Sequence, residues 1–305
     1  MIVSPRHPLP RRGVSHACRG AGTGTFCTVT TTVPFEYLAH VLTVPVCVGD
    51  TETRFIFDSG IGVNLISDSL AREIGCPPSG PVFSGRRMSG QQVTAPMCTL
   101  DSVRLGDSRA RDVPAAIFDM GAMAGLDGIG GFLSLAYFRS TPVTVDYAAR
   151  VLVLEDEQSL ARRAASGFPV SVRVEQDGPS TDVHLALRLP GGRVITVEVD
   201  AGSDELILNQ PLAAEAGVDL TAESVRKVEG QDETGHTFAR YYTALRGDVS
   251  LAAADRIRQS DPDVMFQEII YDGLVGDRFL RNFTVTYDLP RSRMIFAPPT
   301  SPPAV

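Results

Sequence analysis

Short apolar segments separated by turn residues run through the whole chain. Two of them, residues 53–57 and 194–199, are rich in β-branched and aromatic residues, and each runs directly into an aspartate, Asp58 or Asp200. Such segments are typical of β-strands. The 28 Gly and 21 Pro residues are scattered as many short strands joined by turns require. The pattern therefore predicts an all-β protein in which each aspartate stands at the end of a strand.

An offset of 142 residues superposes the two aspartate segments. It aligns Asp58 with Asp200 and Gly60 with Gly202, and it still holds where residues 143, 144 and 146 meet 285, 286 and 288. A match that keeps its register over this length indicates an internal duplication. The predicted organisation is a disordered or flexible tail, a first lobe, a helix-prone linker, a second lobe and a Pro-rich tail, at residues 1–32, 33–156, 157–167, 168–297 and 298–305.

Each half repeats the same series of elements after its aspartate. A second apolar run leads to Ser67 or Asn209, which are good N-caps for a short helix that ends at Gly75 or Gly217. A β-hairpin follows in each half, with its tip at Ser89–Gly90 or Thr234–Gly235. The expected hairpins and the expected short helices before each final strand lie at residues 84–95, 228–242, 132–139 and 278–282.

Composition and charge narrow the class of protein. The 305 residues carry 28 Lys and Arg against 36 Asp and Glu, a net charge of −8, so the chain lacks the basic surface that nucleic-acid binding needs. With 43% hydrophobic and 21% charged residues it is a globular protein. No apolar run is long enough to span a membrane and no signal-like apolar segment follows the first arginines. We therefore expect no nucleic-acid or membrane partner; a cytoplasmic location is favoured, with secretion left open.

The five cysteines all lie in the first third of the chain, at positions 18, 27, 47, 76 and 98. Their number is odd and no Cys-x-x-Cys or Cys/His pattern suits zinc. This distribution predicts a fold without a disulfide framework and without a metal.

The duplicated aspartate is the candidate chemistry. Folding about a pseudo-two-fold axis would place two carboxyl groups side by side, where both cannot ionise and the pair holds one proton. The ionised member can then take a proton from water while the protonated member donates to a carbonyl oxygen. That arrangement hydrolyses an amide without metal or cofactor.

The two halves resemble the retropepsin-like and pepsin-like aspartic peptidases, in the form of a bacterial single-chain enzyme. The resemblance lies in FIFDSGIGVNLIS and DGIGG, residues 55–67 and 127–131, and in VEVDAGSDELILN and DGLVGDRFL, residues 197–209 and 272–280. It implies a two-lobed acid-protease fold, each lobe a closed β unit with short helices. It also implies a catalytic pair with supporting loop residues: Asp58 and Asp200 with Ser59, Gly60, Ala201 and Gly202.

The sequence departs from that family in three places. Ala201 stands where the family carries a hydroxyl residue, so Ser59 alone can form the hydrogen-bonded clasp between the loops, and activity is expected to be weakened. Ile61 and Gly62 replace the usual small residues after the first loop. The first hairpin has no tyrosine, and its tip, the flap candidates Met88, Ser89 and Gly90, is closer to a retropepsin flap.

The resulting prediction is an aspartic endopeptidase that acts on polypeptides as a monomer. The alternative is a catalytically weak or inactive peptide-binding module of the same fold; a structural role has no positive feature in its favour. No Gly-x-Ser-x-Gly motif supports a serine hydrolase. The other acids of the repeated motifs are interpreted as structural: Asp127, Asp146, Asp272 and Asp288.

Overall fold

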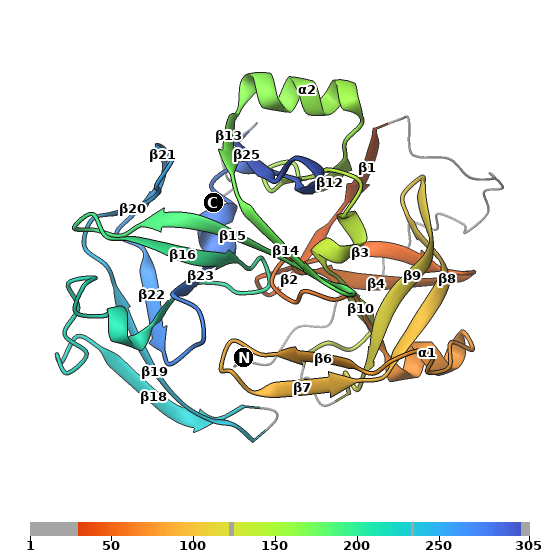
Figure 1. Ribbon diagram of the computed structural model, residues 1–305, viewed down its shortest axis with the longest axis horizontal. Coiled ribbons are helices and arrows are strands. Elements are labelled where there is room, and N and C mark those ends of the chain that lie inside the picture. The colour runs from red at the N-terminus through yellow and green to blue at the C-terminus, as the bar shows by residue number, and fades with distance from the viewer. Residues whose placement is uncertain (1–29, 122–124, 233–234, 300–305) are drawn as a thin grey trace.

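The computed structural model describes residues 30–121, 125–232 and 235–299. It is mostly β-strand with a few short helices, and it has two lobes, which confirms the all-β, two-lobed expectation. Figure 1 shows the lobes side by side, with a third layer of strands and the helix α2 (Glu157–Ser166) above them. The expected tail residues 1–29 and 300–305 and the tip residue Thr234 lie outside the described residues.

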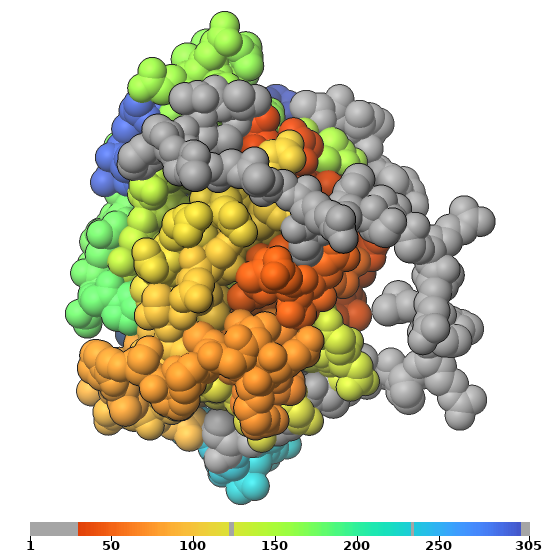
Figure 2. Space-filling model, turned by 90° about the vertical axis from the view of Figure 1, so that its right-hand side faces the viewer, coloured from red at the N-terminus to blue at the C-terminus, as the bar shows by residue number. Residues whose placement is uncertain are grey.

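The N-terminal lobe is a seven-stranded sheet that closes on itself. Its strands follow the order β2-β3-β4-β10-β5-β9-β8, and a further pairing of β3 with β8 completes the closure. Figure 2 shows the outer face of this lobe, where the surface of β8 and β9 lies above that of α1 (Asp68–Glu73). The strands are β2 (Glu36–Leu38), β3 (Val41–Val48), β4 (Thr51–Phe57), β10 (Ile129–Leu133), β5 (Leu65–Ser67), β9 (Ser108–Phe118) and β8 (Met97–Leu105).

The C-terminal lobe repeats this arrangement. The pairing of β15 with β20 corresponds to that of β3 with β8, and the parallel pair β16–β23 corresponds to β4–β10. The strand order is β18-β19-β22-β17-β23-β16-β15-β20-β21, and β14 pairs with β15. The strands are β14 (Arg173–Asp177), β15 (Ser180–Arg188), β16 (Val194–Val199), β17 (Leu206–Asn209), β18 (Arg226–Gln231), β19 (Thr237–Ala244), β20 (Asp248–Leu251), β21 (Ala254–Ser260), β22 (Asp263–Gln267) and β23 (Gly273–Val275).

A third sheet joins the lobes. Strands β11 and β24 pair antiparallel with each other, and Thr144 faces Thr286 with their Oγ1 atoms 2.7 Å apart. Two residues 142 positions apart thus contact each other where the two halves of the chain meet. The sheet order is β1-β12-β11-β24-β25-β13. Its strands are β1 (Thr31–Pro34), β12 (Val151–Leu154), β11 (Val143–Asp146), β24 (Thr284–Asp288), β25 (Arg293–Ala297) and β13 (Phe168–Ser171).

One hydrophobic core runs through both lobes and the joining sheet. Phe57, the residue before the first aspartate, packs edge-on against Phe138 and Tyr287, with ring centroids 5.8 and 6.0 Å apart. Tyr287 belongs to the other half of the duplication and is fully buried. The end of β4 is therefore packed against core residues from both lobes.

The short helices differ in part from expectation. Ser67 caps α1 by accepting a hydrogen bond from Leu70 N, as predicted. Asn209 does not cap, because its Oδ1 accepts from Ile269 N at 3.4 Å, and only a 3-10 turn forms there, η2 (Gln210–Leu212). The expected helix at 132–139 is reduced to η1 (Leu135–Phe138), since its first residues pair within β10. The remaining helices are α3 (Asp277–Leu280) and η3 (Leu289–Arg291).

The expectation of a chain without disulfides is wrong for Cys47, which is disulfide-bonded. It lies buried on β3 beside Arg104, whose guanidinium donates to Sγ at 2.7 Å. Cys76 and Cys98 are free thiols. Within the described residues no helix is long and apolar enough to cross a membrane.

Candidate active site

Equivalent central strands deliver the two aspartates. Asp58 follows β4 and its N–H donates to Leu133 O at 3.0 Å; Asp200 follows β16 and its N–H donates to Val275 O, also at 3.0 Å. In both cases the acceptor lies on or just beside the strand that runs parallel to the aspartate strand. The backbone around each carboxyl group is therefore anchored before its side chain makes any contact.

The carboxyl groups of Asp58 and Asp200 lie beside each other, close enough for each to affect the pKa of the other. Each also accepts from the glycine two residues on, Gly60 N to Asp58 Oδ1 at 2.9 Å and Gly202 N to Asp200 Oδ1 at 3.0 Å. Glycine is required at both positions. A Cβ on Gly60 would come within 2.5 Å of Asp200 Cγ, and one on Gly202 would overlap the Asp58 carboxylate. The loops thus cross, each glycine making room for the opposite aspartate.

The electrostatics of the pair favour a single shared proton. Burial, followed by the neighbouring Asp200 carboxylate, raises the pKa of Asp58 well above its ordinary value. Burial also raises the pKa of Asp200, but hydrogen bonds from Ser203 and Gly202 oppose that rise. The proton is therefore best held by Asp58, with Asp200 ionised, and the two groups titrate as one coupled pair.

Ser59 forms one half of a clasp between the two loops. Its hydroxyl donates to Val199 O at 2.7 Å and accepts from Ala201 N at 2.9 Å, and Ser59 is fully buried. Ala201, also fully buried, offers no hydroxyl in return. The clasp is one-sided, as the sequence predicts.

Sequence reasoning missed two polar contacts at the pair. Ser203 Oγ donates to Asp200 Oδ2 at 2.5 Å, and His40 Nε2 lies 3.0 Å from Gly202 O, across the lobe boundary. The serine had a signal, since it follows Asp-x-Gly directly, whereas its counterpart in the first loop is Ile61. His40 had none, because only the folded chain brings β2–β3 beside the second loop.

The flap candidates lie over the C-terminal lobe. They join β6 (Phe83–Arg86) and β7 (Gln92–Ala95), a separate hairpin that Figure 1 shows reaching from the N-terminal lobe toward β18 and β19. Met88 O accepts from Ile270 N at 2.9 Å, and Gly90 sits against the side chain of Ile270. The hydroxyl of Ser89 is buried with no partner among the described residues. The hairpin tip is thus docked on the opposite lobe.

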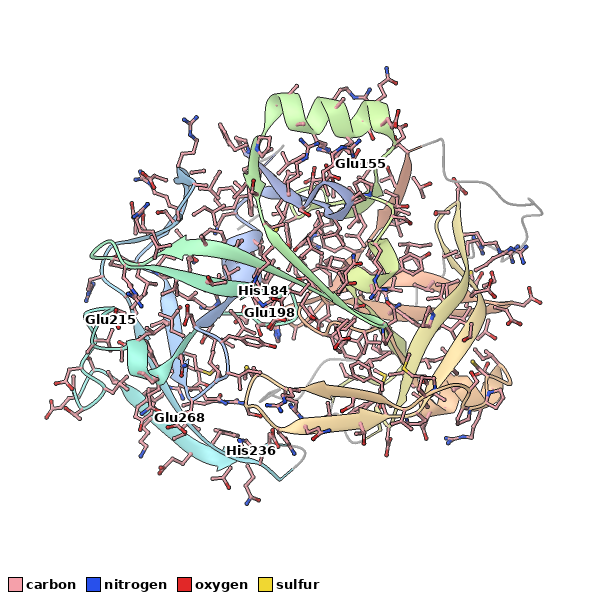
Figure 3. The ribbon with its side chains drawn as sticks, in the orientation of Figure 1. Glu155, His184, Glu198, Glu215, His236 and Glu268 are labelled. Carbon is pink, nitrogen blue, oxygen red and sulfur yellow. The ribbon has the colours of Figure 1, made fainter. Side chains whose placement is uncertain are left out.

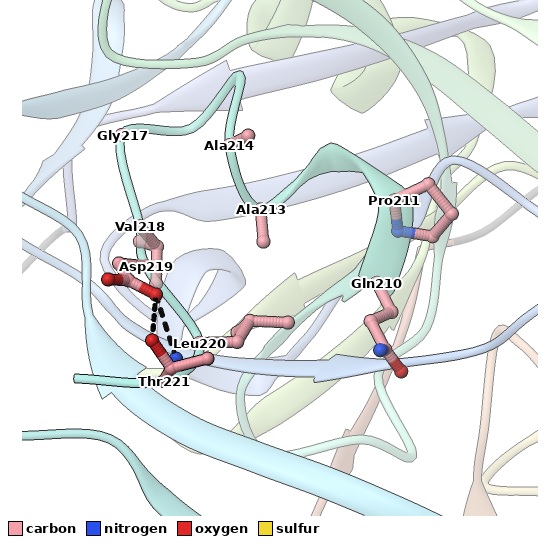
Figure 4. A pocket seen from close by; sticks show the side chains of 9 residues that line it. All are labelled: Gln210, Pro211, Ala213, Ala214, Gly217, Val218, Asp219, Leu220 and Thr221. Atoms are coloured by element: carbon pink, nitrogen blue, oxygen red, sulfur yellow. Dashed lines mark hydrogen bonds between the residues drawn. The ribbon is translucent and has the colours of Figure 1, made fainter. Parts of the chain in front are cut away.

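A separate surface hollow is not part of this site. It has a volume of about 580 Å³ and is lined by residues 210–221, which include neither aspartate. Figure 4 shows its one carboxyl group, Asp219, accepting hydrogen bonds from Thr221. Nor do the described residues contain a cluster of three or more His, Cys, Asp or Glu side chains that could hold a metal ion. The paired aspartates remain the chemically distinctive feature.

A comparison with known protein families covers the first lobe. Residues 44–132 match the family model described as aspartyl protease, and the match includes Asp58 but ends before Asp200. This supports an aspartic-protease family for the chain.

Comparison with individual proteins bears on the fold. No curated protein matches the sequence. Many solved structures resemble the fold, among them the crystal structure of edgp; the match covers 90% of this chain and 96% of that chain, with a TM-score of 0.54. The sequence identity is 10%, so this likeness shows the shared fold alone.

Proposed function

We propose that the chain is an aspartic-type endopeptidase in which Asp58 and Asp200 are the catalytic pair. The observation that supports it most is the pairing of these two buried carboxyl groups, each of which accepts a hydrogen bond from a loop glycine N–H. Groups so placed can act as acid and base on the same peptide bond. The family match over residues 44–132 points the same way.

The proposed reaction uses one water molecule. Asp200, kept ionised by Ser203 and Gly202, takes a proton from the water as its oxygen attacks the peptide carbonyl carbon. Asp58, which holds the shared proton, donates it to the carbonyl oxygen. The tetrahedral intermediate then collapses with protonation of the leaving nitrogen, and the pair returns to its one-proton state. Atoms and charges balance without a cofactor.

Both aspartates come from one chain, so we propose that the monomer is sufficient for catalysis. We propose that the units 33–156 and 168–297 act as the two lobes, with an extended polypeptide lying between the pair and the flap tip. The flap contact of Met88 with Ile270 must open to admit it.

A catalytically weak peptide-binding module is the second candidate. The absence of a hydroxyl at Ala201 favours it, because the clasp that braces the pair is one-sided. Such a module would keep the cleft and bind a segment without cleaving it.

Cleavage of an unfolded protein between about pH 3 and pH 7 separates the two candidates. Asp58→Asn is expected to abolish cleavage, whereas Asp127→Asn, at an exposed aspartate of the same lobe, is expected to retain it. A transition-state-mimicking inhibitor is expected to block the wild-type reaction. Peptide binding without cleavage at any pH would contradict the peptidase and favour the module.

A further inference from the structure

The two lobes differ in the polarity of the side chains at equivalent positions beside the aspartates. In the N-terminal lobe Val41, Ile56 and Leu126 are buried in one apolar cluster. Ile56 lies two residues before Asp58, on the same side of its strand, because side chains alternate along a strand. This cluster therefore lies on the Asp58 side of the pair.

The duplication and the strand register identify its counterpart in the C-terminal lobe. Glu198 matches Ile56 at the offset of 142. Thr43 faces Ile56 and His184 faces Glu198, which aligns Val41 with Asp182. Leu126 and Tyr271 each precede an Asp-Gly pair. The apolar cluster is thus replaced by a polar one, and we call this set the polar cluster: Asp182, His184, Glu198 and Tyr271.

Contacts place the polar cluster beside the paired aspartates and the flap. Figure 3 shows His184 and Glu198 together near the centre of the molecule, and the ring of His184 lies 6.0 Å from that of Tyr271. A Cβ on Gly62, in the first aspartate loop, would come within 2.8 Å of Asp182 Oδ1. Tyr271 directly follows Ile270, which holds the flap tip. A polypeptide lying over the aspartates would therefore pass this cluster.

The polar cluster has unused hydrogen-bonding capacity. Glu198 is 3% exposed, so its carboxyl group is almost wholly removed from solvent. His184 is 4% exposed, and its Nδ1 is buried without a partner among the described residues. Buried polar groups left this way cost stability. Glu198 and Asp182 stand where the other lobe has Ile56 and Val41, and His184 stands where it has Thr43, so the retention of these groups points to a ligand.

The cluster also lacks a positive charge of its own. The charged groups that act most on the pKa of Glu198 are carboxyl groups, those of Asp200, Asp182, Asp58 and Glu175. Two arginines act on other members of the cluster, Arg139 on the pKa of Asp182 and Arg173 on that of His184, but both also contact other groups. Arg139 donates to Thr181 and to Ser180 O, and Arg173 pairs with Glu175 at 2.9 Å.

We propose that the polar cluster is a specificity pocket for a lysine or arginine side chain of the substrate, with Glu198 as its principal anion. The proposal rests on the proposed peptidase function and deepens it. Because the pseudo-two-fold axis passes between the aspartates, the polar cluster and the apolar cluster lie on opposite sides of the bond to be cleaved. The pocket would therefore select a basic residue on one side of that bond only.

The pH dependence of this selectivity follows from the burial of Glu198. Burial and the neighbouring carboxylates raise the pKa of Glu198 to about 9, so in the free protein this group is protonated at neutral pH. A bound cation favours the ionised form and displaces that proton. Burial lowers the pKa of His184, so at neutral pH this side chain is uncharged and adds no opposing charge. Preference for lysine over an uncharged side chain is therefore expected to increase as the pH rises.

The test uses pairs of peptides that differ only in lysine or norleucine at the residue before or after the cleaved bond. The ratio of kcat/KM for the two members cancels the titration of the aspartate pair, which both peptides share. We expect wild type to prefer lysine about tenfold or more at one of these positions. Glu198→Gln, which keeps the shape of the side chain, is expected to bring the ratio close to one. Glu215→Gln, an exposed glutamate of the same lobe, is the matched control and is expected to leave the ratio unchanged.

A lysine preference that survives Glu198→Gln, or a preference for norleucine in wild type, would overturn the proposal. If Glu198→Gln fails to fold, Asp182→Asn is expected to lower the same ratio. If wild type cleaves neither peptide, the peptidase proposal fails, and the pocket is then tested by binding of the same peptides. Tighter binding of the lysine peptide, lost in Glu198→Gln, would support the pocket; equal binding would refute it.

Discussion

The clasp made by Ser59 has a measurable share in the stability of the molecule. Ser59→Ala removes the bonds to Val199 O and from Ala201 N and leaves both backbone groups buried without a partner. An unpaired buried group costs about 1–3 kcal/mol. Ser59→Ala is therefore expected to lower the free energy of unfolding by roughly 2–4 kcal/mol, since part of the penalty is relieved by local relaxation.

Thermal and urea denaturation measure this loss. For a chain of this size 1 kcal/mol corresponds to about 2 °C in Tm, so a fall of about 4–8 °C is expected. Ser171→Ala, at an exposed serine on β13, is the matched control and is expected to stay within about 0.5 kcal/mol of wild type. A Ser59→Ala protein as stable as this control would refute the reasoning that the clasp carries the two buried backbone groups.

Three further predictions concern protonation, the missing hydroxyl and the disulfide. Burial raises the pKa of Asp277 from 3.8 to about 7, so the stability that protonated Asp277 contributes is present below about pH 4 and is lost as the pH rises through 7. In Asp277→Asn the free energy of unfolding in urea is therefore expected to vary less between pH 4 and pH 8 than in wild type. An unchanged pH dependence would count against this reasoning. Ala201→Ser supplies a hydroxyl that can bond to Phe57 O, by symmetry with Ser59, and is expected to raise stability by about 1 kcal/mol or to raise kcat; lower stability with no gain in rate would show packing adapted to alanine. Reduction of the Cys47 disulfide is expected to lower stability by about 2–5 kcal/mol, with Tm compared before and after dithiothreitol; an unchanged Tm would contradict this.

Much of the candidate site could be predicted because its signals are local. The β-rich run before Asp58, the glycine two residues after it and the N-cap at Ser67 each depend on a few neighbouring residues, and the structure places them as expected. The prediction failed where a distant contact competes. Asn209 is a good N-cap by type, but its side chain is engaged by Ile269, some 60 residues away.

The polar cluster is a second feature that the sequence alone could not predict. Glu198 could be seen in the sequence as a glutamate in a β-rich run, but nothing there showed that it is buried and that four other carboxyl groups raise its pKa. Its neighbours come from a hairpin, a strand and a loop that only the folded lobe assembles.

The sequence by itself determined the duplicated plan: two halves at an offset of 142, each with an aspartate at a strand end and a glycine to turn the chain. The alternation of side chains along a strand and the residue preferences of turns act over a few residues, so they can be predicted from the sequence. Only the tertiary structure decided that β11 pairs with β24 and that the carboxyl groups of Asp58 and Asp200 lie side by side. The inter-lobe contacts join residues about 140 positions apart, and their energies arise only when both lobes have formed and burial has changed the surroundings of each group.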